Sequence, residues 1–321
     1  MPALTGGEIR RLGERLRASV DAQAVTKLAL FRQQYTPALL DALDVLLGLC
    51  AGSTGSLSAR IKNSATIIDK LRREPQMDLR NMQDIAGIRL VVSGGRDAQD
   101  VATSALQQAG VFEQLRVIDR RTHPSSGYRA VHVFGKFQSR KMELQVRTQL
   151  QHDWAQFFER LADLYGRRIR YGAPPTPGPG ASIRGVELSR EDVIEEAKEL
   201  AQAIADAEET GSLGREQEAY EQLRAFRDIF VRSTESDNGP PESQEMAGPG
   251  LYLAVYDRAR SVTLEWQTGT AEYLQHIWTG LEERHGGDDN IEIVLLASAS
   301  LEALKRTHAR YFTSTPGLAS P

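Results

Sequence analysis

The pattern of hydrophobic and polar residues predicts two short buried strands that each carry charged side chains. The first covers residues 84–92 and the second covers residues 142–148, and both are rich in aliphatic and β-branched residues. In the second strand, Glu143, Gln145 and Arg147 alternate with aliphatic residues, so the two-residue period of a strand places all three on one face. A carboxylate, an amide and a guanidinium in one row indicate a cleft for a charged ligand. An ordinary half-exposed strand, with that face in solvent, is the alternative interpretation.

Helical and strand-like patterns alternate around these two stretches. We expect helices over residues 1–50, 60–73, 97–108 and 149–170, and further strands over residues 111–118 and 128–134. This order predicts an α/β (α+β) fold in which a mixed or antiparallel sheet is flanked by helices.

Changes in composition divide the chain into several units. A stretch rich in Pro and Gly and a second loose stretch separate these units as linkers. The last unit has a ββαβα pattern without a catalytic constellation, and we interpret its His276, His285 and His308 as surface or packing residues. The expected segments are N-terminal helices (1–50), a central domain (51–171), a Pro/Gly linker (172–186), acidic helices (187–234), a second linker (235–249) and the C-terminal unit (250–321).

The charge of the chain is unevenly distributed. Residues 51–172 carry 20 Lys and Arg against 12 Asp and Glu, whereas the remaining residues carry 19 against 31, so the net charge of −4 hides a basic centre. Such a centre fits an anionic ligand, for example a nucleotide or RNA. The single Cys50 excludes an internal disulfide, and no Cys/His cluster has zinc spacing. With no signal peptide and no stretch long enough to span a bilayer, we expect a cytoplasmic protein without membrane contacts.

Two carboxylates in this basic centre could hold a magnesium nucleotide. Asp84 and Glu143 lie on separate predicted strands that could be neighbours, and Mg²⁺ takes oxygen ligands and bridges phosphates. Alternatively, Asp84 holds the metal alone and Glu143 accepts the proton of an attacking hydroxyl. Tyr128, at the start of a predicted strand, offers a ring for stacking a base, and His132 follows on the same face.

Cations for the phosphates would come from the predicted helix 60–73. Lys62 and Lys70 fall on one face of that helix, and Arg60 lies near its start. A triphosphate needs several cations that converge from a rigid element. The alternative interpretation of this segment is a solvated basic face.

Together these motifs resemble the synthetase domain of the RelA/SpoT family, which makes the alarmones pppGpp and ppGpp and has a nucleotidyltransferase-like fold. The resemblance covers residues 58–165, and the ordered set of motifs is specific although each motif alone is weak. The matching motifs are Arg60-x-Lys62 with Lys70, Asp84-Ile-Ala-Gly-Ile-Arg89, Gly127-Tyr128-Arg129-Ala130-Val131-His132, Glu143-Leu-Gln145-Val-Arg147-Thr148, and Asp153-Trp154-Ala155 with Tyr165.

The resemblance implies that the chain transfers the β,γ-diphosphate of ATP to the 3′-hydroxyl of GDP or GTP, with Mg²⁺ as cofactor. By position in the motifs, Asp84 and Glu143 would be the catalytic and metal-binding residues, with Glu143 as the base. The resemblance assigns ATP and its phosphates to Arg60, Lys62, Lys70 and Arg89, and the acceptor to Tyr128, His132, Gln145 and Arg147, with Tyr128 stacked on guanine.

The same resemblance predicts a small, single-function synthetase. The family's hydrolase domain needs a His-Asp metal site ahead of the synthetase, and residues 1–50 contain no histidine, so we expect no hydrolase activity. The loop before Tyr128 reads His-Pro-Ser-Ser-Gly, and the extension 187–321 is not standard in small synthetases, so the identity of the acceptor stays open.

Two other functions are alternatives. A toxin-type relative would move the same diphosphate onto adenosine nucleotides or onto the 3′ end of tRNA, and the basic run 167–170 would then bind the tRNA backbone rather than form a solvated helix end. A non-catalytic nucleotide sensor is the second alternative, although Asp84 and Glu143 are both present. A homo-oligomer is compatible with each of these functions.

Overall fold

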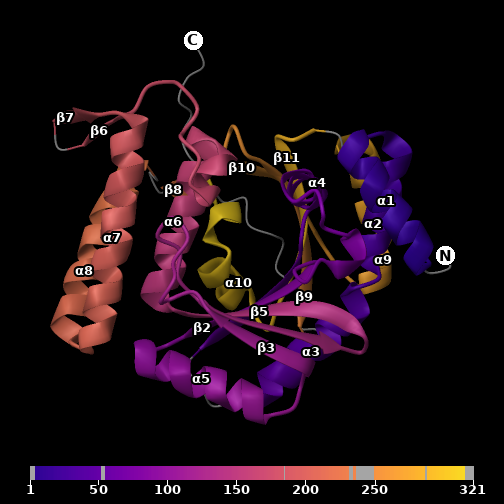
Figure 1. Cartoon of the computed structure of the whole chain (residues 1–321), viewed down its shortest axis with the longest axis horizontal. Helices are drawn as coiled ribbons and strands as arrows, with labels where there is room; N and C mark the ends of the chain where they lie inside the picture. The colour runs from indigo at the N-terminus through magenta and orange to yellow at the C-terminus, as the bar shows by residue number, and fades with distance from the viewer. Residues whose placement is uncertain are drawn as a thin grey trace.

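One eight-stranded sheet organises the chain in the computed structural model, which describes residues 4–51, 55–183, 185–230, 234–235, 249–285 and 288–314. β2 and β5 pair in parallel, and the other described pairs of this sheet are antiparallel. The sheet is therefore mixed and flanked by helices (Figure 1), which confirms the predicted fold class. In spatial order the strands are β10 (Val262–Thr268), β9 (Gly250–Asp257), β11 (Ile291–Ser298), β1 (Ser56–Ile61), β2 (Ala86–Val92), β5 (Arg140–Thr148), β4 (Val131–Phe137) and β3 (Glu113–Asp119).

The C-terminal strands continue the sheet of the central segment. The predicted ββαβα order is present as β9, β10, α9 (Ala271–His285), β11 and α10 (Leu301–Thr307). β11 pairs with β1 in antiparallel register, with Ser298 opposite Ser58 and Leu296 opposite Arg60. Residues more than two hundred positions apart in the sequence are thus neighbours in one sheet, and β9, β10 and β11 of the C-terminal unit all belong to it.

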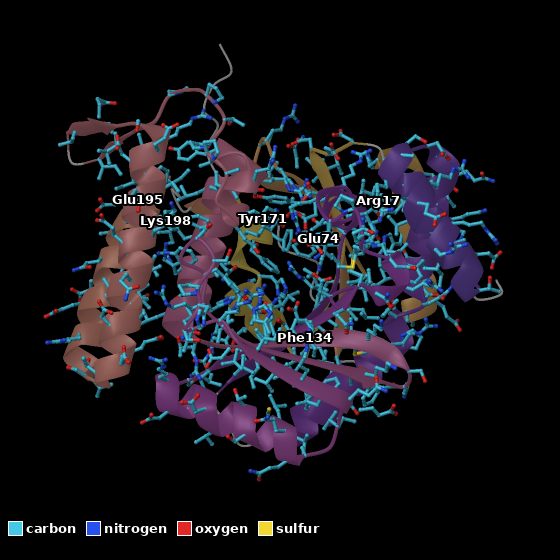
Figure 2. All side chains as sticks on the ribbon, in the orientation of Figure 1. Arg17, Glu74, Phe134, Tyr171, Glu195 and Lys198 are labelled. Atoms are coloured by element: carbon cyan, nitrogen blue, oxygen red, sulfur yellow. The ribbon has the colours of Figure 1, made fainter. Side chains whose placement is uncertain are left out.

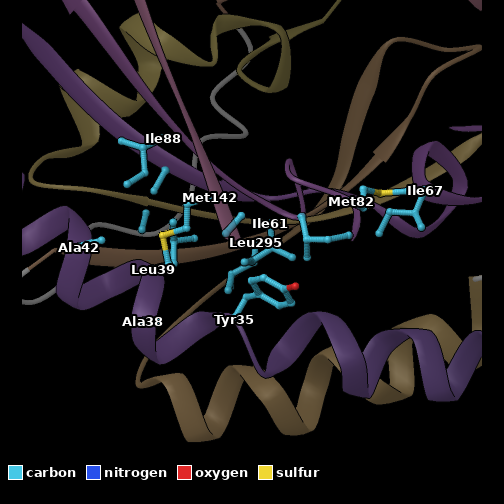
Figure 3. Packing of buried hydrophobic residues seen from close by; sticks show 14 of the residues in the cluster. Tyr35, Ala38, Leu39, Ala42, Ile61, Ile67, Met82, Ile88, Met142 and Leu295 are labelled. Atoms are coloured by element: carbon cyan, nitrogen blue, oxygen red, sulfur yellow. The ribbon is translucent and has the colours of Figure 1, made fainter. Parts of the chain in front are cut away.

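Alternation along the strands gives the sheet one strongly apolar face. Ile61 of β1, Ile88 of β2 and Met142 of β5 point to this face and pack against Tyr35 and Leu39 (Figure 3). The N-terminal helices, expected as packing elements, cover the face together with α9. Their bounds are α1 (Gly6–Ala18), α2 (Ala22–Gln33) and α3 (Thr36–Leu49), and α5 (Arg96–Gln108) packs beside β5.

The opposite face carries the polar positions and is only partly covered. α6 (Gln149–Tyr165) packs against β5 and β2, and α10 lies between α6 and the strands (Figure 1). The predicted acidic helices form the hairpin α7 (Arg190–Thr210) and α8 (Leu213–Phe230), which packs on the outer side of α6. Trp154 of α6 donates a hydrogen bond to the carbonyl of Ala197 at 2.7 Å, which ties the hairpin to α6.

The start of the basic segment differs from the prediction of one helix over residues 60–73. Residues 56–61 form β1, and α4 begins only at Ser64 and ends at Arg73. Leu57, Ala59 and Ile61 alternate with polar residues, which suits a strand, and the side chain of Asn63 caps α4. Arg60 therefore comes from a strand rather than from a helix end.

The remaining elements are short. The predicted linker 172–186 contains the first strand of a small hairpin, and most of the predicted linker 235–249, like part of the predicted loop 51–56, lies outside the described residues. None of the described helices combines the length and the apolar character needed to cross a bilayer. The short elements are η1 (Leu79–Asn81), η2 (Arg167–Tyr171), η3 (Ala309–Tyr311), the hairpin of β6 (Ala181–Ile183) with β7 (Val186–Leu188), and β8 (Thr234–Glu235) with β12 (Thr313–Ser314).

A buried arginine joins the N-terminal helices to the sheet and to the C-terminal unit. Arg32 of α2 is fully buried and forms an ion pair with Glu282 of α9. It also donates hydrogen bonds to the carbonyl of Lys62 at 2.7 Å and to the carbonyl of Ile293 at 3.1 Å. The guanidinium lies 4.6 Å from the ring centroid of Trp278. One side chain thus connects α2, the β1–α4 junction, β11 and α9.

We expect the substitution Arg32→Met to lower the free energy of unfolding by about 3–5 kcal/mol, because Glu282 would keep a buried charge without its partner. The double variant Arg32→Met/Glu282→Leu should recover a large part of that loss. Urea denaturation of the variants measures both values. The exposed Arg10, paired with Glu14 on α1, provides the control Arg10→Met, which should change stability by less than about 1 kcal/mol. An Arg32→Met variant as stable as this control would contradict the assigned role.

Candidate active site

A cavity of about 410 Å³ lies on the polar face of the sheet, bounded by strands, by α6 and by the C-terminal unit. Glu74, at the end of α4, and Tyr171, at the end of η2, both line it and lie between α4 and α6 in Figure 2. Every predicted site residue except Lys70 lines the cavity, namely Arg60, Lys62, Asp84, Arg89, Tyr128, His132, Glu143, Gln145 and Arg147. The structure thus brings together residues from β1, β2, β4 and β5 that are far apart in the sequence.

The row of polar residues on β5 is present as predicted. Gln145 donates a hydrogen bond from Nε2 to Glu143 Oε2 at 3.1 Å, and Arg147 donates from Nη2 to Gln145 Oε1 at 2.7 Å. The three side chains therefore form a connected chain along one face of the strand, while Leu144 and Val146 are buried in the core on the other face.

Glu143 is also bound by a histidine from the neighbouring strand. His132 Nδ1 lies 2.5 Å from Glu143 Oε1, and because a carboxylate only accepts, this nitrogen carries the hydrogen. Burial would raise the pKa of Glu143, but the hydrogen bond and the charge of His132 outweigh it, and the pKa lies below its ordinary value. Glu143 is therefore ionised near neutral pH and can accept a proton.

Tyr128 lies in the turn before β4 rather than in the strand, and two residues hold its hydroxyl. Its Oη is 3.0 Å from His132 Nε2 and accepts a hydrogen bond from Arg147 Nη2 at 2.8 Å. The guanidinium of Arg147 lies 4.9 Å from the centroid of the tyrosine ring. The ring of Tyr128 is thus fixed in orientation at the wall of the cavity.

Asp84 precedes β2 and is held between two lysines. Lys62 Nζ lies 2.5 Å from one carboxylate oxygen, and Lys70 Nζ from α4 lies 3.1 Å from the other. Burial would raise the pKa of Asp84, but the two ammonium groups hold it well below its usual range. Lys70 reaches the site through this contact although it does not line the cavity.

Arg60 and Arg89 form the basic floor of the cavity. Arg89 is buried and donates a hydrogen bond from Nη1 to the carbonyl of Thr307 at 2.5 Å. Burial and the nearby charges of Arg147 and Arg60 lower the pKa of Arg89. Such crowding of like charges favours a ligand that brings negative charge.

Several residues at the cavity were not predicted as site residues. Glu159 of α6 supplies negative charge opposite Arg60, and Arg73 lies 3.7 Å from the ring centroid of Tyr171 at the rim. His308 comes from the C-terminal unit and was expected to be a surface or packing residue. The basic run 167–170 was a sequence signal for the rim, but no local pattern connects residue 308 with a site that lies more than 130 positions earlier in the chain.

The donor set at the cavity fits Mg²⁺. Within the described part of the chain, no group of three or more His, Cys, Asp or Glu side chains could hold a metal ion. Asp84 and Glu143 are two carboxylates on one cavity, and Mg²⁺ is commonly bound by one or two carboxylates with water and substrate phosphates as further ligands.

Fold and site together define an α/β protein with a cleft whose charged lining is mainly cationic, and comparison with known proteins places it more closely. Residues 59–162 match the model of the region found in RelA / SpoT proteins. The chain therefore contains a RelA/SpoT-type domain, as the motifs in residues 58–165 predicted.

Two relatives and one solved structure illustrate the similarity. An uncharacterized protein of Mycobacterium tuberculosis is 34% identical over 178 residues, which cover 54% of this chain and 64% of that protein. The GTP pyrophosphokinase YjbM of Bacillus subtilis is 29% identical over 113 residues, which cover 31% of this chain and 52% of that enzyme. The small alarmone synthetase 2 from Bacillus subtilis aligns with a TM-score of 0.43 and 21% identity, covering 60% of this chain and 97% of that chain. The chain thus spans less than two thirds of the length of the curated relatives it matches.

The partly buried carboxylate of Glu159 should make stability depend on pH. Burial opposes its ionisation, but Arg60, Arg310 and Arg89 lower its pKa to about 2, from an ordinary value of 4.5. A lowered pKa contributes stability that is present above pH 4.5 and is lost as the pH falls towards 2. We expect Glu159→Gln to lower the free energy of unfolding by about 2–3 kcal/mol at pH 7, and this difference should shrink below pH 4.5.

Urea denaturation at a series of pH values between 7 and 3 measures this difference. The matched control is Glu195→Gln on α7, because Glu195 is exposed and pairs only with Lys198 at the surface among the described residues. The control should lie within about 1 kcal/mol of the wild type at every pH. A Glu159→Gln effect of the same size at pH 7 and pH 3 would argue against the electrostatic origin.

Proposed function

We propose that the RelA/SpoT-type domain transfers the β,γ-diphosphate of ATP to the 3′-hydroxyl of GDP or GTP. The observation that carries this proposal is the convergence of Asp84 and Glu143 with several cations in one cavity. The region found in RelA / SpoT proteins includes all of these residues, and a relative of the domain is named a GTP pyrophosphokinase. The chemistry is the attack of a hydroxyl oxygen on the β-phosphorus of ATP, with AMP as the leaving group.

Glu143 is the general base in this proposal. It is ionised near neutral pH, lines the cavity and can take the proton from the 3′-hydroxyl as the new oxygen–phosphorus bond forms. His132 and Gln145 each donate a hydrogen bond to its carboxylate and so fix its orientation. Gln145, His132 and Arg147 are also close enough to one another to contact the ribose and phosphates of the acceptor.

Mg²⁺ is the proposed cofactor, and Asp84 with Glu143 would hold it. The ion would neutralise the charge of the triphosphate. Both oxygens of Asp84 are paired with Lys62 and Lys70, so we infer that these lysines leave Asp84 for the phosphates when the nucleotide binds. Arg60 and Arg89 complete the set of cations for ATP.

We propose that the acceptor nucleotide binds against Tyr128 at the wall of the cavity. Tyr128 would stack on the guanine, because its ring is held in place by the hydrogen bonds at its hydroxyl. We also propose that residues 1–50 do not form the His-Asp metal site of a hydrolase, because they contain no histidine.

The deciding experiment incubates the purified chain with γ-labelled ATP, Mg²⁺ and one acceptor at a time. We expect label to move to GDP or GTP. Separate reactions with AMP, ADP, ATP and tRNA test the toxin-type alternatives, and label on tRNA alone would reject alarmone synthesis. Binding of nucleotide without transfer to any acceptor would support the sensor alternative. Incubation with labelled ppGpp in the presence of Mn²⁺ or Mg²⁺ tests for hydrolysis.

We expect Glu143→Gln to lower kcat by about 10²–10⁴-fold, because the amide cannot accept the proton. Asp84→Asn should abolish most transfer as well, since it removes the proposed metal ligand and the partner of both lysines. The control is Asp44→Asn, which changes an exposed carboxylate on α3, on the other side of the sheet. Initial rates measure the turnover of each variant, and circular dichroism checks that each variant is folded. Turnover near that of the control in either variant would refute the assigned role.

Variants of Tyr128 separate the ring from the hydroxyl. We expect Tyr128→Ala to raise the KM for GDP about tenfold or more, because a stacked aromatic ring contributes about 1–3 kcal/mol to base binding. Tyr128→Phe keeps the ring but loses the contacts with His132 and Arg147, so its KM should rise less. Equal KM values for the wild type and Tyr128→Ala would exclude stacking on the acceptor.

A further inference from the structure

The C-terminal unit contributes His308 to the lining of the cavity, although the unit lies outside the region that matches RelA / SpoT proteins. The carbonyl of Thr307 accepts a hydrogen bond from Arg89, and the carbonyl of Arg306 lies 3.0 Å from His152 Nε2 on α6. Arg306 itself donates to Ser56 Oγ on β1 at 3.1 Å. The end of α10 is therefore bound to the sheet and to α6 on both sides of the cavity.

His308 follows these contacts directly and lines the cavity. Its side chain is only 3% exposed. The hydroxyl of Thr307 lies 2.7 Å from the carbonyl of Ala303, 3.4 Å from the carbonyl of Leu304 and 3.0 Å from His308 Nδ1, and we assign its one hydrogen to the nearest carbonyl, so that its oxygen accepts from Nδ1. Nδ1 therefore carries the hydrogen of the ring, and Nε2 is left with a free lone pair.

Nε2 of His308 has no hydrogen-bond partner among the described residues and is itself covered from solvent, so a ligand group reaches it only when the ring or its neighbours shift. Burial, together with the charges of Arg89 and Arg60, lowers the pKa of His308 well below its ordinary value, so the ring is neutral at neutral pH. A neutral ring in this tautomer accepts a hydrogen bond at Nε2 but cannot donate one there. It would therefore not bind a phosphate oxygen, which is itself an acceptor.

We propose that His308 is a substrate-contacting residue whose Nε2 accepts a hydrogen bond from a ribose hydroxyl or an amino group of a nucleotide in the cavity. The inference rests on the proposed function only in taking a nucleotide as the ligand. Buried polar atoms in proteins are almost always paired, and an unpaired acceptor beside a cavity is a natural partner for a ligand donor. The C-terminal unit would thus complete the binding site of the RelA/SpoT-type domain.

Two substitutions separate a ligand contact from a structural role. His308→Asn can still donate to the hydroxyl of Thr307 but has no atom at the position of Nε2. His308→Gln can place its amide oxygen near that position and so retain an acceptor. The control variant is His276→Asn, because His276 is exposed on α9 away from the cavity.

Isothermal titration of the full chain with GDP and with ATP measures the effect on binding. We expect His308→Asn to bind one of these nucleotides about tenfold more weakly than the wild type, equivalent to about 1.4 kcal/mol. His308→Gln should lie closer to the wild type. Analogues that lack one donor group identify the contacted group. The 2′-deoxy and 3′-deoxy analogues of both nucleotides lack a ribose hydroxyl. Inosine diphosphate lacks the amino group of GDP, and inosine triphosphate lacks the amino group of ATP. With the analogue that lacks the contacted donor, the wild type and His308→Asn should bind equally.

Two results would overturn the proposal. One is wild-type affinity of His308→Asn for both GDP and ATP. The other is a loss of affinity that is the same for the parent nucleotides and for every analogue, as a purely structural role predicts. If His308→Asn does not fold, the ¹⁵N chemical shifts of the histidine rings in the wild type are measured by NMR with and without nucleotide. The signal of His308 is assigned as the one that is missing from the spectrum of His308→Gln. An Nε2 shift that neither GDP nor ATP changes would exclude the contact.

The titration does not depend on turnover, so the two proposals fail separately. Nucleotide binding that depends on His308, in a chain that transfers no diphosphate to any acceptor, would support the contact and reject the proposed function. If the chain transfers diphosphate but His308→Asn binds both nucleotides as tightly as the wild type, the proposed function is supported and the contact of His308 is rejected.

Discussion

The buried ion pair of Arg32 and Glu282 is the contact on which the arrangement of the protein depends. Charges removed from water are costly, and this pair is stable only because further partners satisfy both side chains. Arg32 also binds the carbonyl of Lys62, and Glu282 accepts hydrogen bonds from Ser64 Oγ at 2.9 Å and Trp278 Nε1 at 3.1 Å. The backbone at the β1–α4 junction is thereby fixed from the apolar side of the sheet. The side chain of Lys62 leaves from this junction towards Asp84, so packing on one face sets the charge geometry on the other.

The cationic cavity is maintained by acids placed behind it. Arg310 donates to Glu292 at 2.6 Å and to Glu159 at 3.4 Å, and Arg258 donates to Glu292 at 3.4 Å. These carboxylates belong to α6 and β11, so they neutralise the basic cluster from two directions. Among the residues that line the cavity, seven Lys and Arg side chains outnumber four carboxylates, which leaves an excess of positive charge facing the cavity. The electrostatic balance therefore explains why the cluster folds, and it agrees with the polyphosphate that the proposed function requires.

The C-terminal unit extends the sheet of the RelA/SpoT-type domain and contributes to its cavity. β11 occupies the edge of β1, which would otherwise expose unpaired backbone groups, and the end of α10 binds Arg89 through the carbonyl of Thr307 and brings His308 to the cavity. A segment outside the matched region therefore contributes both to the sheet and to the wall of the site. In the proposed contact of His308 with a nucleotide, binding would depend on the position of α10 relative to β1 and α6.

The sequence by itself determined the features that depend on local periodicity. The two-residue alternation of Glu143, Gln145 and Arg147 places them on one face in any strand, and the order of the motifs identified the RelA/SpoT-type domain. The tertiary structure alone decided which strands are neighbours, because the parallel register that puts Arg89 opposite Gln145 depends on the packing of the whole sheet. It also decided that Arg60 lies on a strand, since pairing with β2 and β11 stabilises an extended backbone in a segment whose polar pattern also suits a helix. His308 reached the cavity for the same reason: long-range strand pairing, which leaves no local signal, carried the C-terminal unit to β1.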